Sequence, residues 1–129
     1  EQMCPAPGQG ALAIQTRSDG EARSICTHLH HAATGSAVRA ERVLLSELGG
    51  GCQLPLGAYA QLTGDTLQLI AVALSPDGTR AVRGQREGPA NQAEDIGKRL
   101  AETLIAQGAH DIFAGLSEIS TPHPSPSRL

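Results

Sequence analysis

The residue with the clearest chemical potential is Cys52, within the stretch ELGGGCQLPLGAY at residues 47–59. The glycines before it remove side-chain cover and permit positive φ, and Pro55 restricts the chain after it. The pattern indicates a thiol on an exposed loop, although a helix cap followed by a buried cysteine fits the residue types equally well. A thiol at a helix C-terminus faces the negative end of the dipole, which disfavours the thiolate. If Cys52 reacts, its partner must be a strong electrophile or a cation must assist, and Arg39 and Arg42 are the neighbouring candidates.

Two other stretches contain residue types that could bind a cofactor or a metal. GQGALA at 8–13 matches the loose dinucleotide pattern G-x-G-x-x-A, which works only between a strand and a helix. A proline-rich turn precedes it and a strand pattern follows, so a tight turn is the favoured interpretation. In CTHLHH at 26–31, Cys26 and His30 are four residues apart and could share a metal on a helix, but a structural zinc site needs four converging ligands. A solvated polar helix end is the favoured interpretation there.

The composition describes a soluble domain with an aliphatic core. Of the 129 residues 40% are hydrophobic, but Tyr59 and Phe113 are the only aromatic ones. The net charge of -3, without a basic run, makes nucleic acid a poor candidate partner. No apolar stretch approaches membrane-spanning length and no signal peptide opens the chain, so we expect no membrane partner and a cytoplasmic location. The three widely spaced cysteines indicate reduced thiols rather than a disulfide framework.

Hydrophobic periodicity predicts a strand and two helices in the first half of the chain. ALAIQT at 11–16 has the pattern of a short strand, and residues 18–31 have that of a helix. Apolar residues then recur at helical spacing up to the glycines at 49–51, with Thr34 or Ser36 as the N-cap. These elements would place Cys52 directly after a helix.

After residue 55 the apolar period changes to that of strands. Gly64-Asp65 and Pro76-Asp77-Gly78 are turn signals that divide residues 57–88 into three antiparallel strands. The middle strand, 66–75, is apolar on both faces and is expected in the centre of the sheet. The more polar third strand is expected at an edge.

The last predicted helix covers residues 90–108, with Asn91 and Glu94 as a capping box. Residues 109–116 are expected to add a short extended piece. This order of elements predicts an α+β fold, a three-stranded antiparallel sheet with helices packed on one face.

The sequence resembles the porphobilinogen deaminase family from about residue 5 to residue 114. The resemblance rests on PAPGQGALAIQTR at 5–17, TGSAVRAERVLLSELGGGCQLPLGAYA at 34–60, LSPDG at 74–78 and IGKRLAETLIAQGA at 96–109. It implies a transferase of heme biosynthesis that joins four porphobilinogen molecules into the linear tetrapyrrole hydroxymethylbilane, with loss of ammonia at each step. The segment around Cys52 is the most specific part of the match.

The resemblance also implies the roles of particular residues. Cys52 would hold a dipyrromethane cofactor through a thioether. Deaminated porphobilinogen is an azafulvene-type electrophile, so a modestly activated thiol can add to its methylene carbon. Gln9 and Gly10 would lie near the cofactor, and Arg17 near the same domain junction. No metal site and no catalytic residue are implied within this chain.

The family has three domains, and the chain resembles only the end of that arrangement. Residues 1–29 would be a strand and a helix from the end of the first domain, 30–116 the C-terminal cofactor-attachment domain, and 117–129 a disordered Pro/Ser-rich tail. The family's catalytic aspartate and many of its substrate-binding cations belong to the first domain. A polycarboxylate substrate demands a cationic cleft, and the chain has 10 Lys+Arg against 13 Asp+Glu. We therefore expect a fragment that is inactive alone and that needs the N-terminal domains of the same enzyme as partners, with porphobilinogen as the substrate of the whole.

Gly49 and Gln15 depart from the family, whose members usually have glutamate at both positions. The extra glycine loosens the loop, and both changes remove negative charge without touching the thiol. The alternative function is a non-catalytic α+β binding or interaction module in which Cys52 is unused. A minor metal-binding domain based on Cys26 and the neighbouring histidines is a second alternative.

Overall fold

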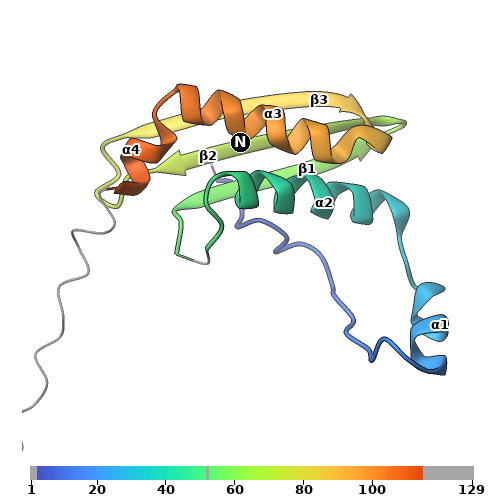
Figure 1. Ribbon diagram of the computed structural model, residues 1–129. Coiled ribbons are helices and arrows are strands. Elements are labelled where there is room, and N and C mark those ends of the chain that lie inside the picture. The colour runs from blue at the N-terminus through green and yellow to red at the C-terminus, as the bar shows by residue number, and fades with distance from the viewer. Residues whose placement is uncertain (1–2, 52, 115–129) are drawn as a thin grey trace, which may run out of the picture.

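The computed structural model describes residues 3–51 and 53–114, which fold into a small sheet with helices on it (Figure 1). In chain order the elements are α1 (Glu21–Thr27), α2 (Ala32–Glu47), β1 (Leu56–Thr63), β2 (Thr66–Leu74), β3 (Ala81–Pro89), the short 3-10 helix η1 (Ala90–Gln92), α3 (Ala93–Ala106) and α4 (Ala109–Ala114). None of the helices in these two ranges is long and apolar enough to cross a membrane. The predicted tail at 117–129 lies outside the described residues.

Two hairpins join the strands into an antiparallel sheet of order β1-β2-β3. Thr63 lies opposite Thr66 across the first turn, where Gly64 has a φ of 60° that suits a residue without a side chain. Leu74 lies opposite Ala81 across the second turn. The predicted meander, with the second strand in the centre and the third at an edge, is confirmed.

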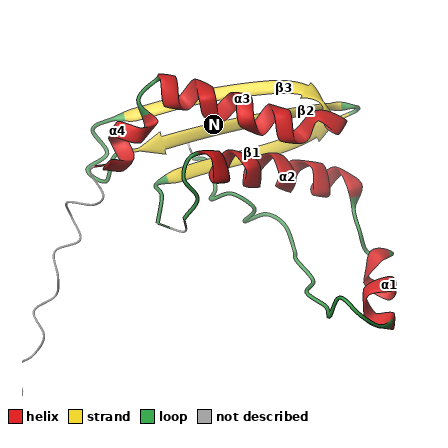
Figure 2. Ribbon diagram, viewed as in Figure 1, coloured by secondary structure: helices red, strands yellow, loops and turns green. Residues whose placement is uncertain are grey.

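Both long helices cover the same face of the sheet (Figure 2). α2 packs mainly on β1, and α3 packs on β3 and β2. The core between the layers is aliphatic, as the composition predicted, and the α+β fold is confirmed. The largest fully buried side chains are Leu44, Leu48, Leu67, Leu69, Leu100 and Leu104. On the opposite face of the sheet, Tyr59 and Leu74 remain partly exposed.

The two helices approach each other closely at Gly97 of α3. A Cβ atom at this position would lie 2.6 Å from the Ala40 carbonyl oxygen and 3.1 Å from the Val43 Cβ. Backbone atoms cannot move aside as a flexible side chain can, so the helix–helix distance depends on glycine here.

The N-terminal ends of both long helices differ from the sequence predictions. His31, rather than Thr34 or Ser36, caps α2, because its Nδ1 accepts a hydrogen bond from the Thr34 N–H at 3.3 Å. The same nitrogen lies 2.7 Å from the Thr34 hydroxyl oxygen. The capping box predicted for the last helix does not form: Gln92 is the N-cap residue and makes no side-chain cap hydrogen bond. Strand β3 continues to Pro89 and η1 leads directly into α3, so the chain enters the helix through a tight 3-10 turn.

Two of the predicted extended segments are wrong. Residues 11–17 have no regular secondary structure, because no strand in the described part of the chain lies beside them to pair with their backbone groups. α1 follows, is shorter than predicted and has no buried residue. Residues 109–114 are helical, because a helical turn buries Ile112 and Phe113 together with Ala109 in the core.

We predict that Gly97→Ala lowers the free energy of unfolding by about 1–3 kcal/mol because it forces α2 and α3 apart. Helix propensity alone would favour alanine by about 1 kcal/mol, so the sign of the change tests the contact. Urea denaturation measures it, with the exposed Glu102→Ala on the same helix as a control that should change stability little. A more stable Gly97→Ala protein would contradict the close approach.

The second hairpin turn predicts a shifted titration of Asp77. Hydrogen bonds from the Ser75 hydroxyl first, and then from the Thr79 N–H and hydroxyl, lower the pKa of Asp77 from its usual value of 3.8. A lowered pKa means that the ionised carboxylate stabilises the turn above about pH 4, and that this contribution is lost as the pH falls through the folded-state pKa. Carbon-detected NMR titration should show the shift, and Ser75→Ala should move the pKa of Asp77 back toward its usual range. An Asp77 that titrates normally in the parent chain would exclude these bonds.

Candidate functional site

The segment that contains Gln9 and Gly10 is a tight turn held against the outer edge of β1. The Gln9 N–H donates to the Ala6 carbonyl at 3.2 Å and the Ala11 N–H to the Gly8 carbonyl at 3.3 Å. Gly8 has a φ of 74°, which favours glycine at this point. The tight-turn interpretation of the GQGALA motif is therefore confirmed, although an irregular segment rather than a strand follows it.

The turn reaches β1 through hydrogen bonds on the edge that β2 leaves unpaired. The Ala58 N–H donates to the Pro5 carbonyl at 2.8 Å. Just before it, Gly57 lies so close to the incoming chain that a Cβ there would be 2.7 Å from the Cys4 carbonyl oxygen. Pro5 thus accepts one N–H of the β1 edge, although residues 4–8 form no strand there.

Glu41 of α2 makes the second connection. Its carboxylate accepts the Gly8 N–H at 2.6 Å with one oxygen and the Ala60 N–H at 2.7 Å with the other. The side chain is buried, and it is the charged member of an otherwise apolar set within the described residues. One carboxylate therefore joins the turn, α2 and β1.

A cavity of about 370 Å³ lies between these three segments. Gln9, Gly10, Thr34, Glu41 and Tyr59 are among the residues that line it. The structure thus brings the two sequence-predicted residues of the turn to one cavity. Arg17 does not line this cavity and is exposed on the segment that leads to α1.

Cys52 lies outside the described residues, so the prediction of an exposed thiol stays a prediction. Its neighbours are described up to Gly51 on one side and from Gln53 on the other. Gly49 and Gly50 have φ values of 103° and 44°, as the glycine-rich sequence permits. Gly51 is exposed, and a Cβ added to Gly49 or Gly51 would meet no atom within 4 Å. Gly49 and Gly51 therefore have open space beside them, whereas a Cβ on Gly50 would lie 3.8 Å from the Ser46 Cα.

Arg39 and Arg42, the candidate cations for the Cys52 thiol, lie in two different environments. The Arg39 guanidinium lies 3.9 Å from the Glu94 carboxylate, in an ion pair whose side chains are both largely exposed. Arg42 lines a different cavity, on the α1 side of α2. Their suggested effect on Cys52 stays a prediction.

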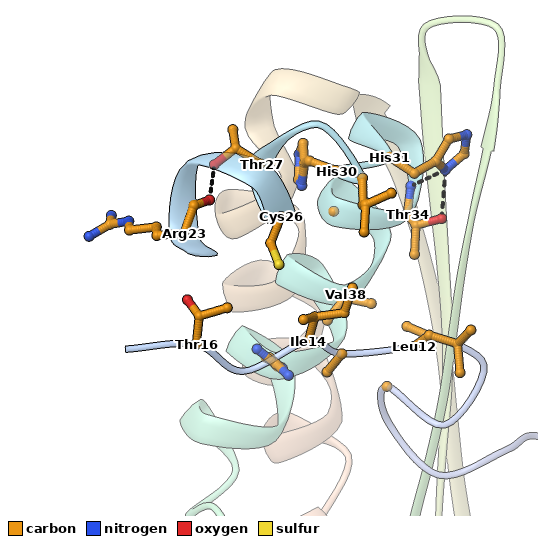
Figure 3. Close-up of a pocket in the computed structure, with 16 residues that line it drawn as sticks. Leu12, Ile14, Thr16, Arg23, Cys26, Thr27, His30, His31, Thr34 and Val38 are labelled. Carbon is orange, nitrogen blue, oxygen red and sulfur yellow. Dashed lines mark hydrogen bonds between the residues drawn. The ribbon is translucent and has the colours of Figure 1, made fainter. Parts of the chain in front are cut away.

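This larger cavity, of about 520 Å³, is formed by residues 11–16, α1 and the first half of α2 (Figure 3). Ile14 and Val38 lie on facing segments of its wall, and Cys26 points toward them from α1 (Figure 3). Cys26 and His30 both line it, although α1 ends at Thr27 and His30 lies beyond the helix.

The three histidines near Cys26 have separate surroundings. The Nδ1 atom of His28 lies 3.0 Å from the Ser24 carbonyl oxygen, and His31 caps α2. The His30 ring packs on Gly35, where a Cβ would lie 2.7 Å from the ring Cε1. Within residues 3–51 and 53–114, no group of three or more His, Cys, Asp or Glu side chains could hold a metal ion.

Sequence reasoning did not identify Glu41 as part of the site. The signal was present, because Glu41 lies four residues after Ala37 and three before Leu44, within the apolar stripe of α2. A carboxylate on the buried stripe of a helix requires a partner, and neither Gly8 nor Ala60 is near it in sequence.

We predict that Gly57→Ala displaces residues 4–8 from the edge of β1, because the added methyl group would overlap the Cys4 carbonyl. Amide hydrogen exchange at Ala58 should become about tenfold faster, while the exchange of β2–β3 amides stays unchanged. Gln61→Ala, at an exposed position of the same strand, is the control and should leave the Ala58 amide as it was. Unchanged exchange at Ala58 in Gly57→Ala would contradict the close approach.

A comparison with protein families gives an independent assignment for the layered part of the structure. Residues 36–106 match the sequence profile described as "Porphobilinogen deaminase, C-terminal domain". The matched range begins in the first half of α2, includes the whole sheet and the Cys52 segment, and ends with α3. It covers more than half of the chain. The chain therefore belongs to the porphobilinogen deaminase family, whose C-terminal domain it contains.

Proposed function

We propose that this chain is the cofactor-carrying C-terminal part of a transferase that condenses four porphobilinogen molecules into hydroxymethylbilane with release of ammonia. The observation that carries the proposal is the family match over residues 36–106, which includes the GGGCQLPLGA segment. Membership of the family indicates a role in tetrapyrrole biosynthesis. The resemblance of residues 5–17 to the same family lies outside the matched range and adds to it.

Cys52 is the residue that would hold a dipyrromethane group. Its sulfur would form a bond to the methylene carbon of porphobilinogen, and the thiol proton would pass to the amino group that leaves this carbon as ammonia, so atoms and charge balance. When bound, the group primes growth of the pyrrole chain. The described neighbours leave room for this bulky substituent, because a Cβ added to Gly49 or Gly51 would meet nothing within 4 Å apart from the adjoining residues of the chain.

The turn at 8–10 would present Gln9 and Gly10 beside the cofactor. Gln9 is exposed, and a Cβ at Gly10 would meet no atom within 4 Å, so the backbone there is open to a ligand. Of these two residues, Gln9 supplies an amide that can donate or accept, and Gly10 permits close approach of the main chain. Both roles are compatible with the carboxylate groups of a pyrrole chain.

The chain would need the preceding domains of the same enzyme for turnover. The cavity at the turn is lined by the acid Glu41 and contains no Lys or Arg among its lining residues, whereas the substrate is a polycarboxylate. Leu12 is fully exposed, and Ile14, Ile25 and Leu29 are 60%, 59% and 66% exposed. Apolar side chains in this number on one short segment favour a partner surface, and we propose that residues 11–29, including Arg17, pack on the first domain.

We expect that the chain, joined to the first two domains of a porphobilinogen deaminase and incubated with porphobilinogen, gains a covalent adduct on Cys52. Intact-mass spectrometry measures the adduct, which Cys52→Ser should abolish and Cys26→Ser should leave in place. The chain without those domains should release no ammonia from porphobilinogen. A bare Cys52 thiol in the joined protein would overturn the proposal and favour a non-catalytic α+β interaction module.

A further inference from the structure

We propose that Glu41 is a positioning residue, which fixes the Gly8–Gly10 turn on the edge of β1 and so sets where Gln9 and Gly10 lie relative to the cofactor. The part that concerns the cofactor rests on the proposed function. The part that concerns the turn rests on the geometry of the chain itself.

The first observation is that the unpaired edge of β1 has two inner N–H groups to satisfy, at Ala58 and Ala60. The Ala58 N–H is satisfied by the backbone carbonyl of Pro5 at 2.8 Å, as in an ordinary strand pair. The Ala60 N–H is satisfied by the Glu41 carboxylate at 2.7 Å instead. The chain at residues 5–8 therefore turns away from β1 after one backbone hydrogen bond. The Glu41 carboxylate accepts the Ala60 N–H, which the backbone of a longer neighbouring strand would otherwise accept.

The second observation is that the same carboxylate holds the departing chain. Its other oxygen accepts the Gly8 N–H at 2.6 Å, at the residue where φ is 74° and the chain turns. Gln9 and Gly10 follow directly, and no other side-chain hydrogen bond to residues 8–11 is present in the described part of the chain. Backbone hydrogen bonds close the turn and hold Pro5 on β1, but at Gly8 the turn is joined to α2 and β1 by one carboxylate that accepts from two donors.

The third observation concerns charge. Glu41 is 6% exposed, and the two ion pairs within the described ranges use Glu94 and Asp95. Two backbone N–H groups, rather than a cation, therefore balance the buried carboxylate. The carboxyl group offers one oxygen to each N–H group, whereas an amide has a single acceptor oxygen, so only the carboxyl group can hold both donors at once.

The helix that carries Glu41 also leads to the segment proposed to hold the cofactor. α2 ends at Glu47, and the glycines that lead to Cys52 follow it. Through Glu41, the Gln9–Gly10 turn is attached to α2, the helix that precedes the proposed cofactor anchor. Displacement of reacting groups by about 1 Å can reduce a rate up to about a hundredfold. The fixed position of the turn relative to α2 therefore matters for attachment of the pyrrole group.

Glu41→Gln is the variant that tests the inference. Glutamine has one acceptor oxygen, and its NH₂ group would face an N–H donor whichever way the amide is turned, so one of the two bonds must break. The amides of Gly8 and Ala60 should exchange about tenfold to a hundredfold faster in the variant chain. The β2–β3 amides should keep their parent rates, as should all amides in Glu102→Gln, the control at an exposed glutamate.

Unchanged exchange at Gly8 and Ala60 in Glu41→Gln would overturn the inference. Equal acceleration of all amides would also overturn it, because Glu41 would then support the fold as a whole. Should Glu41→Gln fail to fold, Glu41→Asp decides the question: it keeps two acceptor oxygens on a shorter side chain, and it should release one of the two N–H groups selectively.

The link to the cofactor is tested in the chain joined to the first two domains of a porphobilinogen deaminase. The Cys52 adduct should form about tenfold or more slowly in Glu41→Gln, while alkylation of Cys52 by iodoacetamide keeps its parent rate. Equal adduct rates in parent and variant would overturn the link. No adduct in the parent would overturn the proposed function instead, and amide exchange alone would then decide the role of Glu41 in the turn.

Discussion

The unpaired edge of β1 is the constraint on which the arrangement of the proposed site depends. A sheet of order β1-β2-β3 leaves that edge without a neighbouring strand, and its N–H groups need acceptors. Pro5 and Glu41 supply them, one from the backbone and one from a side chain of the covering helix. Because the two acceptors come from different layers, satisfying the edge also fixes the turn at Gly8 against the domain.

The layered core gives this edge a rigid support. With few aromatic residues, the core fills its space with leucine and alanine, and the helices can approach until Gly97 meets the backbone of α2. Close packing of this kind transmits position well, since small side chains leave few alternative arrangements. α2 therefore has a defined location on the sheet. Glu41 in its second half holds the turn at Gly8, and the glycines before Cys52 follow its C-terminal end.

The segment between the turn and α2, by contrast, is not part of the packed core. Residues 11–17 are irregular and lead to α1 (Figure 1). α1 buries no side chain, and Leu12 and Ile14 are exposed. The family match begins at residue 36, after this segment. The exposed apolar side chains of this segment contrast with the closely packed body formed by the sheet, α2 and α3.

The sequence by itself determined the sheet, the two long helices and the family. Turn residues at 64–65 and 76–78 define hairpins through local backbone geometry, and helical spacing of apolar residues is visible without any long-range information. The segment around Cys52 was specific enough to indicate the family that the match over residues 36–106 then showed. Only the tertiary structure decided that residues 11–16 are unpaired, that residues 109–114 form a helix, and that Glu41 holds Gly8 and Ala60. Each of these depends on partners distant in sequence: a strand needs a neighbour, a short apolar run takes the form that buries it, and a buried carboxylate is explained only by the donors that surround it.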